Sequence, residues 1–248
     1  MRLHFRPLFG FTLLCLPMFA LLVGLGIWQL ERLHWKLRLI AEITRNMAAA
    51  PISLDAALAL GEQAQYRPVA LTGRFENARE VYAFTTGPKG EPVYHILTPF
   101  KLVDGRTMLI DRGLIPTTLR DPASRPGSEL QGTVDMVGIW RTPDKPGPFT
   151  PHPDMEHRVW FARDLSGIAQ AEHLKLAAPA ILEAKTSRAG APWPRGGQTR
   201  VDMPNDHLQY ALTWFLLAGA LVIIYFTYHR AHGRLVFGVG RRLGQTGN

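Results

Sequence analysis

The feature that most constrains this chain is a pair of long apolar runs, one near each end, that contain no charged residue. The first covers residues 8–30 and the second residues 208–228. As a helix rising 1.5 Å per residue, the first run would span about 34 Å, enough to cross a bilayer core with some tilt. We therefore predict two transmembrane helices, the first kinked at Pro17, with a folded domain between them.

A cleaved signal peptide is the alternative for the first run. Its apolar core would have roughly 7–15 residues and would end at a cleavage site of small residues. Here the run passes directly into Trp28-Gln29-Leu30-Glu31-Arg32, so we expect an uncleaved anchor. Cys15, the only cysteine, lies inside this run, which excludes a disulfide within the chain and predicts an ordinary apolar role.

The charge of the chain is concentrated at its ends. Lys and Arg number 28 against 20 Asp and Glu, yet no acidic residue occurs before Glu31 or after Asp206. The ends carry Arg2, Arg6, Arg230, Arg234, Arg241 and Arg242. Basic flanks beside apolar helices are typical of the inner face of a membrane, whereas a nucleic-acid-binding protein carries its excess charge on the folded domain. We therefore expect membrane lipid, and no nucleic acid, as a partner.

These observations predict the organisation of the whole chain. We expect a cytoplasmic basic tail (1–7), a transmembrane helix (8–30), a periplasmic β-rich domain (31–207), a second transmembrane helix (208–228) and a second basic tail (229–248). Only six residues precede Pro7, too few for a mitochondrial transit peptide. The expected location is therefore a bacterial inner (plasma) membrane, with both termini inside and the domain in the periplasm.

The segment between the runs begins with a helical pattern. Apolar residues recur at helical spacing from Leu33 to Met47, so the first helix should continue to about Ala49 and stop before Pro51. Ser53 then caps a short helix that Gly61 closes.

Strand-like runs follow at 66–75, 79–86, 92–103, 106–115 and 132–141. Asp104-Gly105 is a strong hairpin turn between the third and fourth runs. Later strands are expected at 157–165 and 179–186, with a short helix at 166–174 and a return linker at 186–204. The predicted fold class is an α+β membrane protein in which two transmembrane helices flank an antiparallel sheet or small barrel.

The usual enzyme motifs are absent from the sequence, which contains no CxxC, HExxH, GxSxG or P-loop, so we expect no enzyme. Eight of the nine histidines lack metal-ligand spacing and are expected to be structural or solvated: His4, His34, His95, His152, His157, His173, His229 and His232.

His207 differs because it begins the second apolar helix, where Tyr210, Ala211, Trp214 and Ala218 share its face. This face suits a flat hydrophobic ligand whose metal needs one nitrogen donor. It equally suits an interfacial aromatic belt without a ligand. The residues alone leave both open.

Three sequence blocks resemble one known family. They are GLGIWQLERLHWK (24–36), DGRTMLIDRGLIP (104–116) and NDHLQYALTWF (205–215), in this order. They are similar to blocks of the surfeit-locus-one family of cytochrome c oxidase assembly proteins, and with the two-helix topology the resemblance covers nearly the whole chain. Its motif positions here are Gln29, Arg32, Arg112, Gly113 and Asn205. The chain departs from the family at Leu114, where an aromatic is usual.

The resemblance implies an assembly factor for cytochrome c oxidase that binds haem a and helps its delivery to, or retention in, the nascent haem-bearing catalytic subunit. It also implies enzymes of haem a synthesis as further partners. Carried over by position, His207 is the haem-iron ligand, and Tyr210, Trp214 and Trp28 are the apolar walls of the haem site.

We also predict structural roles for Arg112 and Gly113. Gly113 would adopt a positive φ at the end of a strand, and Arg112 would bind nearby carbonyls or a carboxylate.

Two other functions remain open at this stage. One is a cofactor-free membrane scaffold that stabilises oxidase assembly intermediates. The other is an enzyme acting on haem or quinone, which would need an acid–base group beside His207. Asp206 is adjacent, but a helix-cap role explains it.

Overall fold

The computed structural model describes residues 2–187, 192–197, 199 and 205–238. The chain divides into two compact units, Met1–Ile40 with Asp202–Asn248, and Ala41–Val201. The first unit is a helix pair and the second is a β-rich domain. Helix α1 begins in the first unit and ends in the second.

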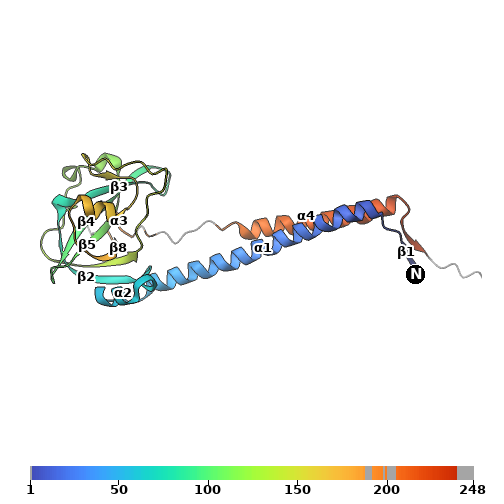
Figure 1. Cartoon of the computed structure of the whole chain (residues 1–248), viewed down its shortest axis with the longest axis horizontal. Coiled ribbons are helices and arrows are strands. Elements are labelled where there is room, and N and C mark those ends of the chain that lie inside the picture. The colour runs from blue at the N-terminus through green and yellow to red at the C-terminus, as the bar shows by residue number, and fades with distance from the viewer. Residues whose placement is uncertain (1, 188–191, 198, 200–204, 239–248) are drawn as a thin grey trace, which may run out of the picture. The chain divides into compact units, whose positions relative to one another are not determined.

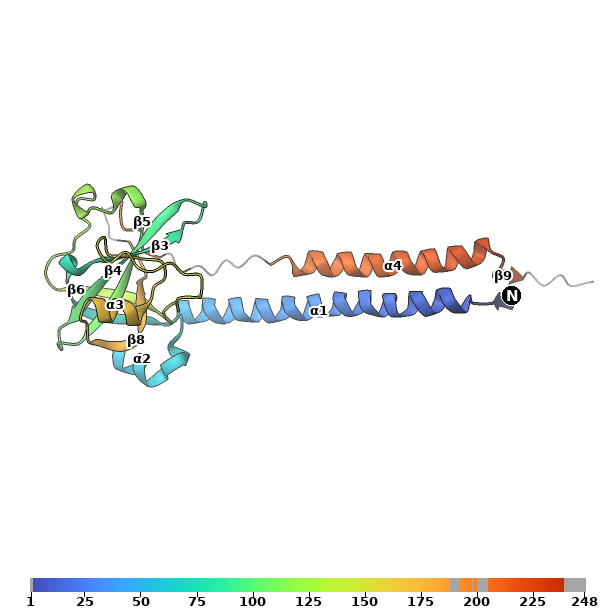
Figure 2. The same cartoon turned by 45° about the horizontal axis from the view of Figure 1, so that its top comes forward.

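The helix pair consists of α1 (Phe9–Ala48) and α4 (His207–Ala231), which run side by side (Figures 1 and 2). The predicted continuation of the first helix is confirmed, because α1 runs unbroken from the apolar run to Ala48. Asp206 stands at the N-cap position of α4, but its side chain makes no capping hydrogen bond. The helix therefore begins where predicted, but the Asp206 side chain does not cap it.

A short antiparallel ribbon joins the two ends of the chain, which the sequence did not predict. Strand β1 (Arg2–Phe5) pairs with β9 (Leu235–Gly238), and Phe5 lies opposite Leu235. Residues 2–5 and 235–238 therefore lie beside each other within this unit.

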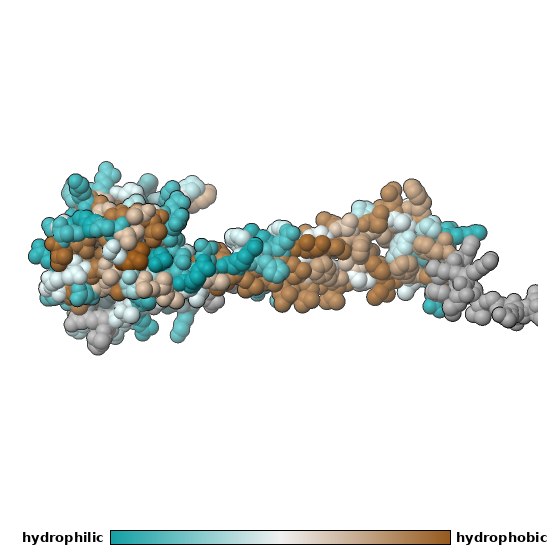
Figure 3. Space-filling model, turned by 90° about the horizontal axis from the view of Figure 1, so that it is seen from below, coloured by the Kyte–Doolittle hydropathy of each residue, from teal (hydrophilic) through white to brown (hydrophobic). Residues whose placement is uncertain are grey.

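The apolar residues of both helices are mostly uncovered. Only 11% of the most apolar window of each helix is buried, and both helices are long and apolar enough to cross a membrane. Phe9 is 82% exposed and Leu216 is 72% exposed. Figure 3 shows hydrophobic side chains gathered over the helix pair. A core helix of a soluble protein would bury this surface, so these helices need another apolar environment.

The β-rich domain contains seven strands and two short α-helices among the described residues. In chain order they are α2 (Leu54–Leu60), β2 (Pro68–Phe75), β3 (Val81–Thr86), β4 (Pro92–Leu102), β5 (Thr107–Pro116), β6 (Val134–Arg141), β7 (Val159–Trp160), α3 (Leu165–Ala171) and β8 (Leu176–Ala184). Short 3-10 helices occur at Gly61–Ala64, Asn77–Arg79, Thr117–Leu119 and Pro122–Ser124. Ser53 caps α2 by accepting the Ala56 amide, and Gly61 ends it at a φ of 56°, as predicted.

Five of the strands close into a small barrel. The sheet order is β2-β6-β8-β5-β4-β3-β7, and a further pairing of β2 with β4 closes the first five strands. The hairpin at Asp104-Gly105 joins β4 to β5, as predicted. Of the two predicted architectures, an antiparallel sheet or a small barrel, the small barrel is confirmed. Most strand pairings are antiparallel, but β5 with β8 and β3 with β7 are parallel.

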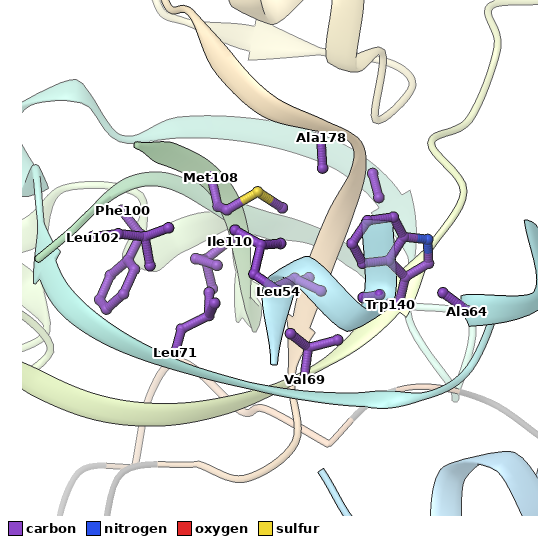
Figure 4. Close-up of a cluster of buried hydrophobic side chains, with 13 residues drawn as sticks. Leu54, Ala64, Val69, Leu71, Phe100, Leu102, Met108, Ile110, Trp140 and Ala178 are labelled. Atoms are coloured by element: carbon purple, nitrogen blue, oxygen red, sulfur yellow. The ribbon is translucent and has the colours of Figure 1, made fainter. Parts of the chain in front are cut away.

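The barrel encloses the main hydrophobic core. Figure 4 shows Phe100, Ile110, Leu71 and Trp140 converging there, with Leu54 of α2 among them. Strand β5 lies between this core and a second one, because Met108 and Ile110 face the barrel while Leu109 faces Trp160 and α3. A strand buried on both faces explains why the run 106–115 shows no polar alternation.

Arg112 and Gly113 lie inside β5, so the prediction that Gly113 ends a strand is wrong, although its predicted positive φ is confirmed. Gly113 has a φ of 114°, and a Cβ there would overlap the carbonyl oxygen of Arg195. The Arg112 guanidinium donates to the Ser128 carbonyl, lies 3.6 Å from Glu80 Oε2 and sits 4.9 Å above the Phe75 ring. Leu114, the departure from the family pattern, is 8% exposed.

Candidate functional site

Small residues bring α1 and α4 into close contact. A Cβ on Gly26 would lie 2.6 Å from Phe215 Cε1, so only glycine fits without a shift. On α4, Ala211 is 1% exposed and Ala218 is 3% exposed, and Cys15 of α1 is also buried. Small side chains at such contacts let helix backbones approach each other closely. The face of α4 that carries His207 therefore packs partly against α1.

His207 is held by a residue of the other helix. Its Nδ1 lies 2.7 Å from Oε1 of Gln29, a side chain only 9% exposed. An amide oxygen can only accept a hydrogen bond, so Nδ1 carries the proton in this pair. Among the described residues no hydrogen bond to His207 Nε2 is found. The half-buried imidazole therefore keeps one nitrogen lone pair available to a metal.

His229, at the opposite end of α4, is arranged differently. The ring is fully buried, its Nδ1 lies 2.8 Å from the Tyr225 carbonyl oxygen, and its Nε2 accepts the Leu8 amide at 3.1 Å. Both ring nitrogens are hydrogen-bonded, so His229 connects the start of α1 to the end of α4 and has no lone pair available for a metal. The sequence left a structural or a solvated role open for His229, and the structure gives it the structural one, inside α4.

The aromatic residues predicted as walls lie on one flank of the helix pair. Gly26 and Phe215 meet on the other flank. Trp28 lies about 160° round α1 from Gly26, and Tyr210 lies about 140° round α4 from Phe215, so both face away from that contact. Trp28 is 51% exposed and Tyr210 is 55% exposed. Trp214, two turns beyond His207, is half-buried.

Two polar residues flank His207 and Gln29. Oδ1 of Asn205, two residues before His207, is buried without a hydrogen-bond partner among the described residues. Arg32 follows Gln29 by one turn of α1, and its guanidinium carbon lies 4.5 Å above the Trp35 ring. The site thus combines one nitrogen donor, an unpartnered acceptor, a fixed cation and exposed aromatic faces.

The arrangement does not resemble a site for a bare metal ion. Among the described residues, no three His, Cys, Asp or Glu side chains are grouped closely enough to hold one. A single imidazole suits a metal whose other ligands come from its own macrocycle, such as haem iron.

An apolar cavity between the helices lies elsewhere. It is lined by Thr12, Cys15, Phe19, Val222 and Tyr225 near the end that carries His229, and measures about 210 Å³. Ordinary ligand pockets measure roughly 300–1,000 Å³. This cavity therefore does not fit a large flat ligand.

The densest group of charges lies in the domain and is structural. Asp111, 2% exposed, lies 2.7 Å from His95 Nδ1 and 3.3 Å from Arg163 Nη1. Arg163 also binds Glu183 at 2.5 Å and Asp144 at 3.0 Å. Burial alone would raise the pKa of Asp111, but the contacts of its carboxylate with His95, Arg163 and the Gly113 amide outweigh burial and lower the pKa. The group ties β4, β5 and β8 together.

Sequence reasoning found His207 but missed the role of Gln29. The pair is separated by 178 residues, and a single sequence carries no signal for such a contact. A weaker signal existed, because Gln29 places an amide at the end of a charge-free apolar run. Amides in such runs usually hydrogen-bond across to another helix.

Comparison with known proteins agrees with this architecture. The sequence profile of the SURF1 family matches residues 16–219. This chain belongs to the SURF1 family. It is 36% identical to mouse Surfeit locus protein 1 over 229 residues, which cover 86% of this chain and 73% of the relative.

Other relatives match over a similar length. Human Surfeit locus protein 1 is 33% identical over 232 residues, covering 87% of this chain and 75% of the relative. The SURF1-like protein of Drosophila melanogaster is 33% identical over 236 residues, covering 88% and 76%. The family profile therefore spans most of α1, the whole domain and the first half of α4, so the similarity extends beyond one sequence block.

Proposed function

We propose that this SURF1 family member is an assembly factor for cytochrome c oxidase, and that it binds haem a through His207 and delivers it to, or retains it in, the nascent catalytic subunit. Family membership supports the assembly role. The observation that carries the haem role is the 2.7 Å contact between His207 Nδ1 and Gln29 Oε1, because it leaves Nε2 to ligate iron. The bound haem would supply only its iron and its flat macrocycle, with no catalytic step by this chain.

The surrounding residues fit the chemistry of haem a. Trp28 and Tyr210 offer exposed aromatic surface to a macrocycle, and half-buried Trp214 lies deeper on the same helix. The Arg32 guanidinium suits a propionate carboxylate. Oδ1 of Asn205, which has no hydrogen-bond partner among the described residues, can accept from a hydroxyl group, which haem a carries on its side chain and protohaem lacks.

We place the helix pair in a bacterial inner membrane, with the basic tails in the cytoplasm and the barrel domain in the periplasm. The length, composition and exposure of α1 and α4 support the membrane, and the acid-free basic ends support the orientation. In this arrangement His207 lies at the outer membrane edge, where haem can keep its propionates in water and its macrocycle in the apolar layer. The partners would be the oxidase catalytic subunit and enzymes of haem a synthesis.

The test is the haem content of the purified protein. The wild type, made in cells that synthesise haem a, should carry haem a, and His207→Ala should lose it while remaining inserted and folded. His34→Ala removes an exposed imidazole from α1 and is the matched control. Full haem a with an unchanged visible spectrum in His207→Ala would contradict the ligand assignment. A wild type without haem would favour the cofactor-free scaffold.

A further inference from the structure

We propose that Gln29 is the positioning residue of the His207 site, which sets the imidazole tautomer and ring orientation and thereby the donor strength of Nε2. The inference rests on the proposed function in one respect, because the metal in question is haem iron. It adds a role for a residue that does not touch the ligand and acts only through His207.

The geometry determines where the proton lies. Gln29 Oε1 and His207 Nδ1 are 2.7 Å apart, a normal hydrogen-bond distance. Because Oε1 has no hydrogen, the proton lies on Nδ1, and the neutral ring then has its lone pair on Nε2. The opposite tautomer would place a proton on Nε2 and block it as a ligand.

The contact is built into the helix pairing and does not depend on a ligand. Gln29 is 9% exposed, and an amide left without a partner in an apolar layer would cost free energy. Gly26 lies one turn earlier on α1 and meets Phe215, which sets the spacing of the helices at this level. The imidazole is therefore oriented before any haem arrives, which lowers the cost of ordering it on binding.

A neutral amide is also a weaker acceptor than a carboxylate. Acceptors that receive the second imidazole proton raise the basicity of the ligating nitrogen, and a charged acceptor does so more strongly. An amide at this position therefore gives an oriented ligand of moderate strength. Such a ligand suits a carrier that must release its cargo.

The first arm of the test uses the full chain without haem. In nitrogen-15 spectra of histidine-labelled protein at alkaline pH, the resonance that His207→Ala removes should show a proton on Nδ1. In Gln29→Leu that preference should be lost, and in Gln209→Leu, which alters an exposed glutamine of α4, it should persist. A proton on Nε2 in the wild type would mean that the Gln29 amide is reversed, and would overturn the proposal.

The second arm measures haem a. Gln29→Leu should weaken haem a binding about 10-fold or more, as loss of such supporting residues does at other metal sites. Gln29→Glu should retain haem and lower its reduction potential, because the carboxylate makes the imidazole a stronger donor. Gln209→Leu should change neither quantity.

The outcomes separate the two proposals. If Gln29→Leu matches the wild type in affinity and potential while His207→Ala loses haem, Gln29 has no positioning role and the proposed function stands. If the Gln29→Leu protein fails to insert into the membrane, the Gln29→Glu variant becomes the test. A haem reduction potential in Gln29→Glu equal to that of the wild type would then overturn the inference. If the wild type binds no haem, the proposed function fails and the metal role of Gln29 fails with it.

Discussion

Among the described residues of the barrel domain, each fully buried charged side chain lies near an opposite charge. Glu80 is 5% exposed and lies against Arg125, which is 3% exposed, and the pair also meets Arg112 and Ser128. The hydroxyl of Tyr82 joins this group, where burial and the Glu80 carboxylate raise its pKa. Removing one partner from such a group leaves a charge buried alone, which costs far more than the pair itself contributes.

Asp111→Asn should reveal this cost and its dependence on pH. At neutral pH we expect a loss of about 3 kcal/mol of unfolding free energy, because Arg163 loses a buried counter-charge. The folded-state pKa of Asp111 is below its unfolded value, so its stabilisation is present above about pH 4 and is lost as pH falls through the folded pKa.

Denaturant unfolding of the full chain in detergent, followed by tryptophan fluorescence, measures the effect. The difference between wild type and Asp111→Asn should shrink between neutral pH and about pH 3. A difference that stays constant over this range would show that the carboxylate charge contributes nothing. Asp135→Asn, an exposed carboxylate of β6, is the control.

Gly113→Glu should lower the amount of folded protein. The substitution forces an L-residue to a φ of 114° and drives its Cβ into the Arg195 carbonyl, so both backbone strain and overlap oppose it. Gly105→Glu is the matched control, because Gly105 also has a positive φ but nothing lies within 4 Å of its Cβ. Yield and thermal stability should fall further for Gly113→Glu. A normal yield with an altered haem spectrum would move this loop into the functional site.

At the scale of single residues, the sequence shows which side chains can ionise or bind a metal, but not which residues they contact. His207 stood out because an ionisable group at the start of an apolar helix is unusual. The contact to Gln29, the burial of His229 and the partners of Arg112 all depend on segments far apart in the chain. Such contacts follow from the tertiary packing of elements, which local patterns do not encode.

At the scale of elements, periodicity and turn chemistry predicted most of the strands and helices. The hairpin at Asp104-Gly105 and the short helix between Ser53 and Gly61 are correct because their signals are local. The run 157–165 reads as a strand but forms only Val159–Trp160, because its apolar residues pack into two cores beside a short parallel contact with β3. The parallel pairings could not be read from the sequence, since side-chain alternation does not report strand direction.

Two glycines of α1 offer a test of the helix pairing. Gly26→Leu should separate α1 from α4, because a Cβ there lies 2.6 Å from Phe215, whereas Gly24→Leu should be tolerated, because nothing lies within 4 Å of that position. The contact between Gln29 and His207 lies one turn from Gly26, so Gly26→Leu should also reduce haem retention. Thermal stability in detergent and haem content per protein measure both effects. Equal behaviour of the two variants would mean that the pairing at Gly26 does not position His207.

At the scale of the whole molecule, a segment before α1 pairs with a segment after α4. The ribbon of β1 and β9 places residues 2–5 beside residues 235–238, so these two segments must lie on one side of any membrane that the helix pair crosses. The described acidic residues all lie between the two apolar runs. Because basic flanks are retained in the cytoplasm, this arrangement predicts an external domain.

Cysteine labelling can test this topology because the chain contains a single cysteine. Cys15 is buried and can be replaced by Ala to give a silent background. In that background, Phe149→Cys places a thiol in the domain at a position that is 96% exposed, and His232→Cys places one just after α4, also exposed.

A maleimide that cannot cross membranes should label Phe149→Cys in intact spheroplasts. It should label His232→Cys only after the membrane is opened, because the charge asymmetry predicts that this end lies inside. The reverse pattern would invert the topology and move His207 to the cytoplasmic edge. Labelling of both variants in intact cells would mean that the helix pair does not span the membrane.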